Sequence, residues 1–357
     1  MTSNHFSITP DPEGLGKCLI LSGLIDRSSQ ASFADVESQL RQRPSPVLRL
    51  NLSAVDGMDG AGLQLLTIFL FNLHKSNFHL TAVGAPAWLL DVLRLTRLDA
   101  ILTIDPATTP SISAVVLTGG AEWCSPVTSL DCSALPPHAI AVNARNRLPL
   151  TPFSGFGSLW QRTYRVALPG VDLSAAQVMA AWKGNFSAFW PEGNDLLTPG
   201  EPPQPGMPAV IHLSLPGGMK LYTGALIMHA NAESFSLMTL QGHMFCGWIT
   251  FSCFVEGGTL HAQTQALLRP SDALYDLSFR VGFGTRAEDA FWHASLINLA
   301  AHFGVKGEIR QTNILLDKRV QFKHFGNLWF NAGIRSVIYS VTHPFAARKT
   351  LRKRNPQ

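Results

Sequence analysis

Short apolar runs alternate with helical patterns over the first hundred residues, and this alternation constrains the fold more than any other feature. The run "VLRLNL" (47–52) has leucine at every second position, as in a strand that buries one face. Between such runs, apolar residues recur at helical spacing, as Phe33, Val36 and Leu40 do. The expected strands are 17–24, 47–52, 78–83 and 100–104, and the expected helices are 31–40, about 62–75 and a segment that starts at Pro86. Strands separated by helices predict an α/β layer in which helices cover a sheet.

The loop before the second of these helices has an unusual composition. Residues 55–66 read "VDGMDGAGLQLL", with three glycines and two aspartates. One interpretation is that Asp59 caps the helix while the glycines allow a tight turn from strand to helix. The other, which the family resemblance described next implies, is that the loop, with Asp59, Gly60, Ala61 and Gly62, binds a partner protein in one fixed state.

Three stretches resemble a known family when they are taken together. They read "LSGLIDRSSQASFADVESQL", "LRLNLSAVDGMDGAGLQLL" and "LTAVGAPAWLLDVLRLTRLDAILTI". Their order and spacing are similar to the STAS domain of anti-sigma factor antagonists, sulfate transporters and lipid-transport accessory proteins, over residues 14–105. The resemblance implies a domain that binds a protein partner and brings no catalytic group.

The same resemblance exposes a departure in the loop. In the anti-sigma factor antagonists the loop reads Asp-Ser-Ser-Gly or Asp-Ser-Thr-Gly, and a partner kinase phosphorylates the hydroxyl after the Asp. A phosphate there would lie on the N–H groups and positive dipole end of the following helix. Here the two positions are Gly60 and Ala61, which have no hydroxyl. We therefore expect the loop to be non-phosphorylatable.

The next segment, residues 106–158, has the composition of a connection. The pieces "DPATTPSIS", "ALPPH" and "LPLTPFSGFGS" are rich in Pro, Ser, Thr and Gly. The apolar pieces "AVVL" and "AIAV" make a fully flexible linker improbable, because a long apolar loop tends to pack against a domain. We place the domain boundary somewhere in this stretch.

The second half predicts mostly strands. "TYRVAL" (163–168) reads as a strand, and either Asp172 or Ser174 is expected to cap a helix that Gly184 interrupts. Several strands follow, with a hairpin turn at Glu256-Gly257-Gly258. The last element is a helix over 288–303, with an apolar stripe formed by Trp292, Leu296, Leu299 and Phe303.

This order of elements resembles the START-like superfamily of lipid-transfer, polyketide-cyclase and related bacterial proteins. The stretch "LMTLQGHMFCGWITFSCFVEGG" is the most similar to the family, and the resemblance covers 159–305. It implies an α+β helix-grip domain, in which a curved antiparallel sheet wraps around a helix and leaves an apolar cavity. The residues expected to line that cavity are Trp182, Phe186, Phe189, Tyr222, Met228, His243, Trp248 and Trp292. The alternative is that these aromatic and methionine side chains are ordinary core.

No motif in the sequence indicates a catalytic residue, a cofactor or a metal. The histidines form no HxH or HExxH pattern, and neither GxSxG nor a phosphate-cradling GxxxxGK loop occurs. His243 follows Gly242 and is interpreted as a hydrogen-bonded wall residue, with the orientation of a ligand's polar group as the alternative. We expect no cofactor and no metal site.

Residues 306–357 form an amphipathic helix and a basic tail. Nine Lys or Arg and no Asp or Glu lie from Lys318 onward, while all 24 acidic residues precede it. Phe330, Ile334, Val337, Ile338 and Val341 share one helical face, which we expect to pack on the second domain. The alternative is that this amphipathic helix lies on an anionic membrane surface. The basic residues of the tail are Arg348, Lys349, Arg352, Lys353 and Arg354. A cluster of this kind favours weak contact with an anionic membrane, the alternative being a solvated terminus; nucleic acid is not an expected partner.

Together these features predict a non-enzymatic bacterial regulatory or adaptor protein. The first domain would bind a protein partner, and the second a hydrophobic small molecule or lipid. A cyclase or hydrolase in the second domain, or a peripheral lipid-trafficking component, is the alternative. The five cysteines form no CxxC pair and the N-terminus lacks a basic start and an apolar run, so a cytoplasmic location, with peripheral contact at the inner membrane, is expected.

Overall fold

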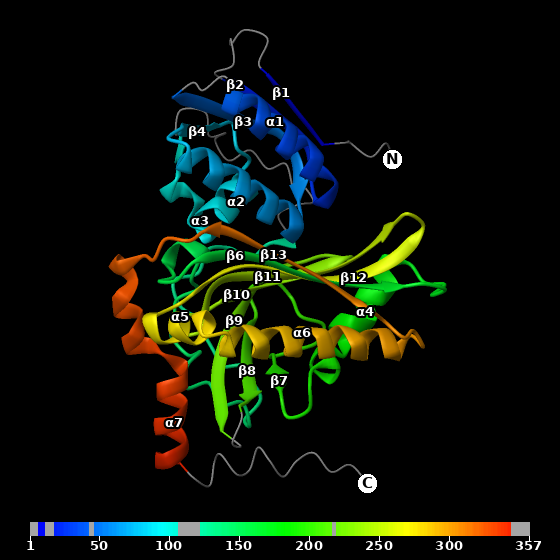
Figure 1. Cartoon of the computed structure of the whole chain (residues 1–357), viewed down its shortest axis with the longest axis vertical. Coiled ribbons are helices and arrows are strands. Elements are labelled where there is room, and N and C mark those ends of the chain that lie inside the picture. Colours follow the sequence, from blue (N-terminus) through cyan, green and yellow to red (C-terminus); the bar gives the residue numbers. More distant parts are fainter. Residues whose placement is uncertain (1–5, 11–17, 43–45, 106–121, 216–218, 344–357) are drawn as a thin grey trace. The chain divides into compact units, whose positions relative to one another are not determined.

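The computed structural model describes all residues except 1–5, 11–17, 43–45, 106–121, 216–218 and 344–357, and it divides the chain into two compact units (Figure 1). The first unit comprises Met1–Pro126 and the second Val127–Gln357. Among the described residues, no helix combines the length and the apolar character that a membrane crossing requires.

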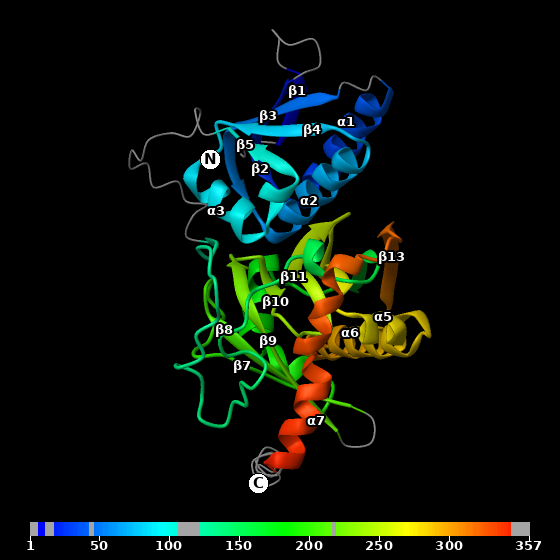
Figure 2. The ribbon, with the colours of Figure 1, turned by 90° about the vertical axis from the view of Figure 1, so that its left-hand side faces the viewer.

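The first unit is a five-stranded sheet with helices, which confirms the α/β expectation. The sheet order is β1-β2-β3-β4-β5; β1 pairs antiparallel with β2, and the other pairs are parallel. The helices α1 and α2 pack side by side (Figure 2). The elements in chain order are β1 (Ser7–Pro10), β2 (Cys18–Ile25), η1 (Arg27–Ser29), α1 (Gln30–Gln42), β3 (Val47–Met58), α2 (Gly60–Lys75), β4 (His79–Val83), α3 (Ala87–Leu95), η2 (Leu98–Ala100) and β5 (Leu102–Ile104).

The alternation in β3 decides which face the strand buries. Leu48, Leu50 and Leu52 are at most 1% exposed, whereas Arg49 between them is exposed. Since side chains alternate across a strand, these leucines form one continuous face of the core. The helix α2 buries its apolar side chains on most of its surface, as expected for a helix that covers a sheet.

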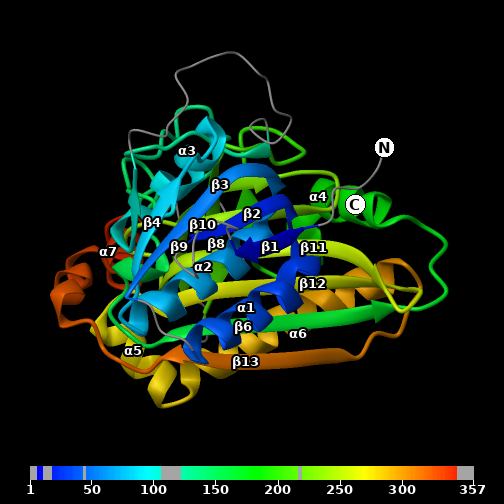
Figure 3. The same cartoon turned by 90° about the horizontal axis from the view of Figure 1, so that it is seen from above.

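The second unit is an eight-stranded antiparallel sheet with a long helix across one face. Its order is β13-β6-β12-β11-β10-β9-β8-β7, and Figure 3 shows β13, β6, β12 and β11 side by side with α6 along them. The helix α6 packs against β6, β12 and β13, which is the arrangement of a helix-grip fold. The elements are η5 (Pro152–Ser154), β6 (Leu159–Leu168), α4 (Ala175–Gly184), η6 (Phe186–Phe189), β7 (Asp195–Leu197), β8 (Pro208–Ser214), β9 (Lys220–Ala230), β10 (Ser234–Thr239), β11 (Phe245–Glu256), β12 (Thr259–Pro270), α5 (Ala273–Arg280), α6 (Phe283–His302), β13 (Ile309–Asp317), η8 (Phe322–Phe330) and α7 (Ala332–Thr342).

The helix-capping and turn residues of this unit lie where the sequence predicts them. Ser174, rather than Asp172, caps α4 in a capping box with Gln177, and the helix ends at Gly184 before η6. The turn between β11 and β12 consists of Gly257 and Gly258, both with positive φ, as a two-residue hairpin requires. The last long helix begins at Phe283, earlier than expected, and α5 precedes it.

Two elements differ from the sequence-based expectation. Residues 309–317, assigned above to the amphipathic helix and tail, form the edge strand β13. The helix α7 does pack on β9, but with the opposite face from the one expected: Ala332 and Ser336 are fully buried, whereas Ile334 and Val341 are 44% and 75% exposed. The expectation that the apolar face packs on the domain is therefore wrong. The physical reason is that the small side chains of the inner face allow close approach, and that Ser336 accepts a hydrogen bond from the Tyr222 amide at 2.9 Å.

Candidate functional site

The loop between β3 and α2 has the geometry of a helix N-terminus without a hydroxyl. The Gly62 amide donates to the carboxylate of Asp59 at 2.7 Å, so Asp59 caps the helix as expected. Gly60, Ala61 and Gly62 are buried. A side chain at Gly62 is excluded, because a Cβ built there would lie 1.9 Å from the carbonyl oxygen of Ile25. The loop thus depends on its glycine for the close approach of α2 to the end of β2.

A tryptophan that sequence reasoning missed lies against this loop. Trp123 donates its indole N–H to the carbonyl of Met58, the residue before Asp59, at 2.9 Å. Its side chain is 6% exposed, and the neighbouring Cys124 is buried too. Both lie within the first unit, although the sequence assigns them to a connection. No local pattern connects Trp123 to a loop 65 residues earlier.

A pocket of about 300 Å³ lies in the second unit, between the sheet and the beginning of α6. It draws on β6, β11, β12, β13, α5 and α6. Its apolar wall consists of Trp160, Phe245, Leu268, Pro270 and Phe279. Its polar lining consists of Ser158, Arg162, Asp276, Arg280, Thr285 and Asn313. This is the mixture typical of a small-molecule site, in which apolar walls surround a few polar groups.

Arg162 is the buried cation of this pocket, and its guanidinium is held by protein groups. Its Nη1 donates to Glu288 and its Nη2 to Asp289, the latter at 2.7 Å; its Nε donates to Asn313 at 3.3 Å. The side chains of Arg162 and Glu288 are both 6% exposed. Three of the five N–H groups of Arg162 are therefore used by neighbours, and the fork is fixed in one orientation.

The strand register explains why these groups meet. Arg162 and Tyr164 are two residues apart in β6 and so point to the same face, and β13 places Asn313 and Gln311 directly beside them. Tyr164 and Gln311 both donate to Asp289 of α6, at 2.7 and 2.8 Å. The inward face of β6 therefore changes from apolar core at Val166 to a polar network at Arg162.

Glu288 has the most perturbed carboxyl group near the pocket. Burial is the main cause that raises its pKa to about 7; the nearby Arg162 opposes the shift and Asp289 adds to it. The other carboxylate at the pocket, Asp276, accepts a hydrogen bond from Arg280 at 2.6 Å. Each of these carboxylates thus has an arginine partner.

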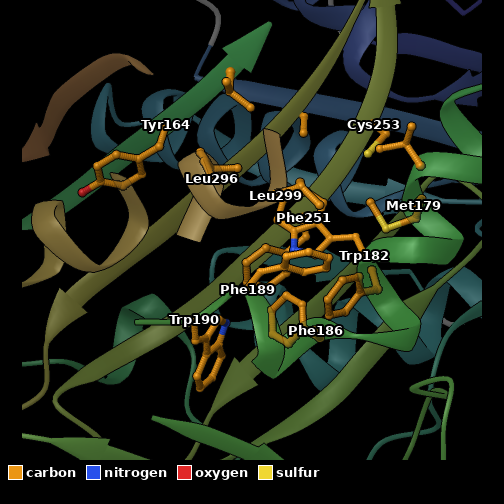
Figure 4. Packing of buried hydrophobic residues seen from close by; sticks show 14 of the residues in the cluster. Tyr164, Met179, Trp182, Phe186, Phe189, Trp190, Phe251, Cys253, Leu296 and Leu299 are labelled. Carbon is orange, nitrogen blue, oxygen red and sulfur yellow. The ribbon is translucent and has the colours of Figure 1, made fainter. Parts of the chain in front are cut away.

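Four of the side chains expected to line a cavity pack in an aromatic core instead of lining this pocket. Trp182, Phe186 and Phe189 are at most 5% exposed (Figure 4). Trp292 is partly buried and packs against the same core. The Phe186 ring lies 4.7 Å from that of Phe251 and 4.9 Å from that of Phe235. Rings at these distances fill the space between the sheet and α6.

The remaining four lie elsewhere. Ile227 belongs to the core that faces α6, so strand alternation places Met228 and Tyr222 on the other face of the sheet. Trp248 lies beside Ile249 of the same core and points away from it for the same reason. His243 precedes β11 and accepts a hydrogen bond from the Phe245 amide at 3.0 Å, and burial lowers its pKa to about 4. The structure therefore does not bring the eight residues together in one site.

The other expected sites are located as follows. The basic residues Arg348, Lys349, Arg352, Lys353 and Arg354 lie outside the described residues. Within the described ranges, no group of three or more His, Cys, Asp or Glu is arranged to hold a metal ion.

Solved structures with similarity to part of the chain share little sequence with it. The di-domain ARO/CYC StfQ from the steffimycin biosynthetic pathway is 10% identical with a TM-score of 0.32, over 40% of this chain and 50% of that one. Protein Ms6760 from Mycobacterium smegmatis is 10% identical with a TM-score of 0.30, over 40% and 89%. Major latex-like protein 151 from Panax ginseng is 18% identical with a TM-score of 0.28, over 41% and 99%. The match thus spans half the length of StfQ, and similarity this low says nothing about ligand or activity.

The first unit has a clearer relative. No curated protein matches the chain. The family model described as "Mlab, STAS domain" matches residues 13–103, which run from β2 into β5 and include the loop at Asp59. Residues 13–103 of the first unit are thus similar to the STAS domain family.

Proposed function

We propose that this is a non-enzymatic regulatory or adaptor protein of bacteria that binds a protein through its STAS domain and a hydrophobic small molecule or lipid through its second unit. The observation that carries the ligand half is the pocket at Arg162, with five apolar side chains around a fixed guanidinium. An apolar ligand would pack against the wall formed by Trp160 and Phe279. An acceptor oxygen of the ligand would accept hydrogen bonds from the N–H groups of Arg162 that do not bind Glu288, Asp289 or Asn313.

The protein-binding half of the proposal is supported by the STAS match and by the loop at Asp59. The loop is fixed by the cap on α2, by the close approach at Gly62 and by the Trp123 hydrogen bond. A rigid loop loses little conformational entropy when it binds. Because neither Gly60 nor Ala61 can accept a phosphate, binding there would not be switched by phosphorylation.

A cyclase or hydrolase is the second candidate, and the raised pKa of Glu288 favours it. A carboxyl group with a pKa of about 7 suits general acid–base catalysis near neutral pH. Against this, Glu288 is held by Arg162 and is not itself among the residues that line the pocket. Binding without chemistry needs only the groups that line the pocket, so we favour it.

Native mass spectrometry of the purified full-length protein tests whether an apolar molecule is bound in the pocket. Thr285 lines the pocket from the first turn of α6, so Thr285→Phe fills part of it. Ala287 lies on the same helix and is exposed, which makes Ala287→Phe the matched control. We expect the wild type and the control to carry a bound apolar molecule that Thr285→Phe lacks. Wild-type protein without any bound molecule, or equal retention in both variants, would overturn the proposal.

Incubation with the released molecule separates binding from catalysis. A binding protein returns the molecule unchanged. Chemical conversion by the wild type but not by Glu288→Gln would establish the enzyme instead, because the amide keeps the shape of the side chain and removes its proton transfer.

We further propose that the protein resides in the cytoplasm and makes a weak contact with the inner membrane through the basic residues after Pro344. The five cysteines form no CxxC pair in the sequence, which suits a reducing compartment. Five clustered basic residues would attract anionic lipids by about 1 kcal/mol each near the surface, a contribution that salt weakens.

A further inference from the structure

The helical segments η8 and α7 run end to end along one side of the second unit (Figure 2). Hydrogen bonds from polar side chains hold both segments against the second unit. Asn327 donates to the carbonyls of Ser154 and Ser271, both at 2.8 Å. Asn331 donates to the carboxylate of Asp272 at 2.8 Å and caps α7 by accepting from the Ile334 amide. Both segments are therefore held by directed hydrogen bonds, and the rings of Phe322 and Phe325 also contact that of Phe156, at 5.8 and 6.1 Å between centroids.

The inner face of α7 is made of small and polar groups. Ala332 and Ser336 are fully buried, and the Ala332 amide donates to the carbonyl of Gly242 at 2.9 Å. Arg335, the charged residue of the helix, donates to the side chain of Asn143 at 2.9 Å. The polar side of this amphipathic helix thus faces the protein, which leaves its apolar side to face outward.

The outward side chains of these two segments are large and apolar. On α7 they recur at helical spacing and so form one stripe. On η8 the Trp329 side chain is 84% exposed and Phe322 76%. The full set is Phe322, Phe325, Trp329, Ile334, Val337, Ile338 and Val341, exposed by 44–84%. We call this set the apolar face of η8 and α7; exposed apolar groups gathered in this way mark interaction surfaces.

Charge indicates what covers this face. From Lys318 to the C-terminus the chain has nine basic and no acidic residues, and Lys323 lies within η8 itself. A second copy would bring together two segments that both have a net positive charge, which is unfavourable. An anionic bilayer offers both the negative charge for the basic residues and an interface in which tryptophan and aliphatic side chains are favoured.

We propose that the apolar face of η8 and α7 inserts into the surface of an anionic membrane. The inference builds on the tail contact proposed above for initial attraction, and it adds a hydrophobic component that the tail does not have. Insertion would bury Trp329 and the α7 stripe in the headgroup region while the rest of the second unit remains in water. The hydrogen bonds of Asn327 and Asn331 keep the face in place, so insertion needs no unfolding.

Co-sedimentation of the full-length protein with vesicles of phosphatidylcholine and phosphatidylglycerol tests this. Ile338 and Val341 are 58% and 75% exposed, so changing both to Ser leaves the core intact. Leu173 and Val255, 40% and 62% exposed outside this face, give the matched control when both are changed to Ser. We expect Ile338→Ser/Val341→Ser to lower partitioning by tenfold or more, since two aliphatic side chains no longer leave water on insertion. The control should bind as the wild type does.

A second variant distinguishes this face from the tail. Truncation after Pro344 removes the basic cluster and should weaken binding mainly at low salt. If truncation abolishes binding while Ile338→Ser/Val341→Ser binds as the wild type does, the face does not insert and only the tail contact stands. If Ile338→Ser/Val341→Ser loses binding and truncation has no effect, the proposed tail contact is wrong and insertion of the apolar face of η8 and α7 is supported. A dimer in light scattering that the Ser variant dissociates would overturn the membrane proposal in favour of a second copy.

Discussion

Glu288 is a buried carboxyl group whose proton affinity changes on folding. In the folded protein its pKa is about 7, raised from 4.5 by burial. Between pH 4.5 and pH 7 the folded state therefore binds more protons than the unfolded state. The contribution of this group to the free energy of unfolding is most favourable below pH 4.5 and is lost as the pH rises to about 7.

The change Glu288→Gln removes this titration. The difference in free energy of unfolding, variant minus wild type, should rise by about 3 kcal/mol as the pH goes from 4.5 to 7. Urea denaturation at a series of pH values measures it. Glu308→Gln, at an exposed carboxylate, is the control and should show no such rise. A difference for Glu288→Gln that stays constant across this range would mean that the folded protein does not hold the proton.

The loop at Asp59 should carry no phosphate in cells. Neither Gly60 nor Ala61 has a hydroxyl, and both are buried. Phosphopeptide mapping of residues 56–66 checks this, with Gly60→Ser as the variant that restores a hydroxyl. That variant is modified only if a cognate kinase still recognises the surface. Phosphate on any of these residues in the wild type would contradict the prediction.

At the level of single elements, strands with one buried face were predictable, whereas the edge strand β13 was not. The alternating leucines of β3 identify a strand because one of its faces forms core. The edge strand β13 is exposed along most of its length and has no such pattern; its pairing with β6 depends on residues about 150 positions apart. Periodicity also identifies the apolar stripe of α7, but it cannot say which face hydrogen-bonds to the domain.

The same limit explains why the pocket was missed. Arg162 belongs to a strand signalled by "TYRVAL" and its neighbours, but its partners Asn313 and Glu288 come from β13 and α6. Only the fold brings them together. An arginine on the inward side of a strand, two residues from Tyr164, is the one local signal available, because alternation would place its charge in the core.

The end of β13 is joined to β12 by a buried ion pair. Arg269 donates to Asp317 at 2.7 Å, and both side chains are 2% exposed. Asp317→Asn leaves a buried guanidinium without its counter-charge and should cost about 3–5 kcal/mol of stability. The control is Glu256→Gln, which weakens the more exposed pair with Arg165 and should cost less than about 1 kcal/mol. Thermal denaturation of both variants measures this; similar small losses would show that the pair does not hold the edge strand.

On the scale of the whole chain, the sequence identified two folded parts but not the segment that joins them. Residues 127–158 have the composition of a linker, yet the structure groups them with the second unit. Asn143 donates to the carbonyl of Tyr222 at 2.7 Å, and the Leu150 amide donates to the carbonyl of Thr239 at 2.8 Å. Proline and glycine report turns, but they do not report whether a turn-rich segment packs on a sheet.

Two fragments test where the second unit begins. Residues 127–357 keep these contacts, and we expect this fragment to unfold in one cooperative transition, because it contains the complete sheet and its own core. The fragment 159–357 starts at the strand β6 and loses the hydrogen bonds of Asn143, Leu150 and Phe156. Each is worth on the order of 1 kcal/mol, and the buried backbone groups that remain without partners add to the loss. Urea denaturation followed by circular dichroism should therefore show a markedly lower midpoint for 159–357, or no transition at all. Equal midpoints would mean that residues 127–158 are a linker after all, as their composition indicates.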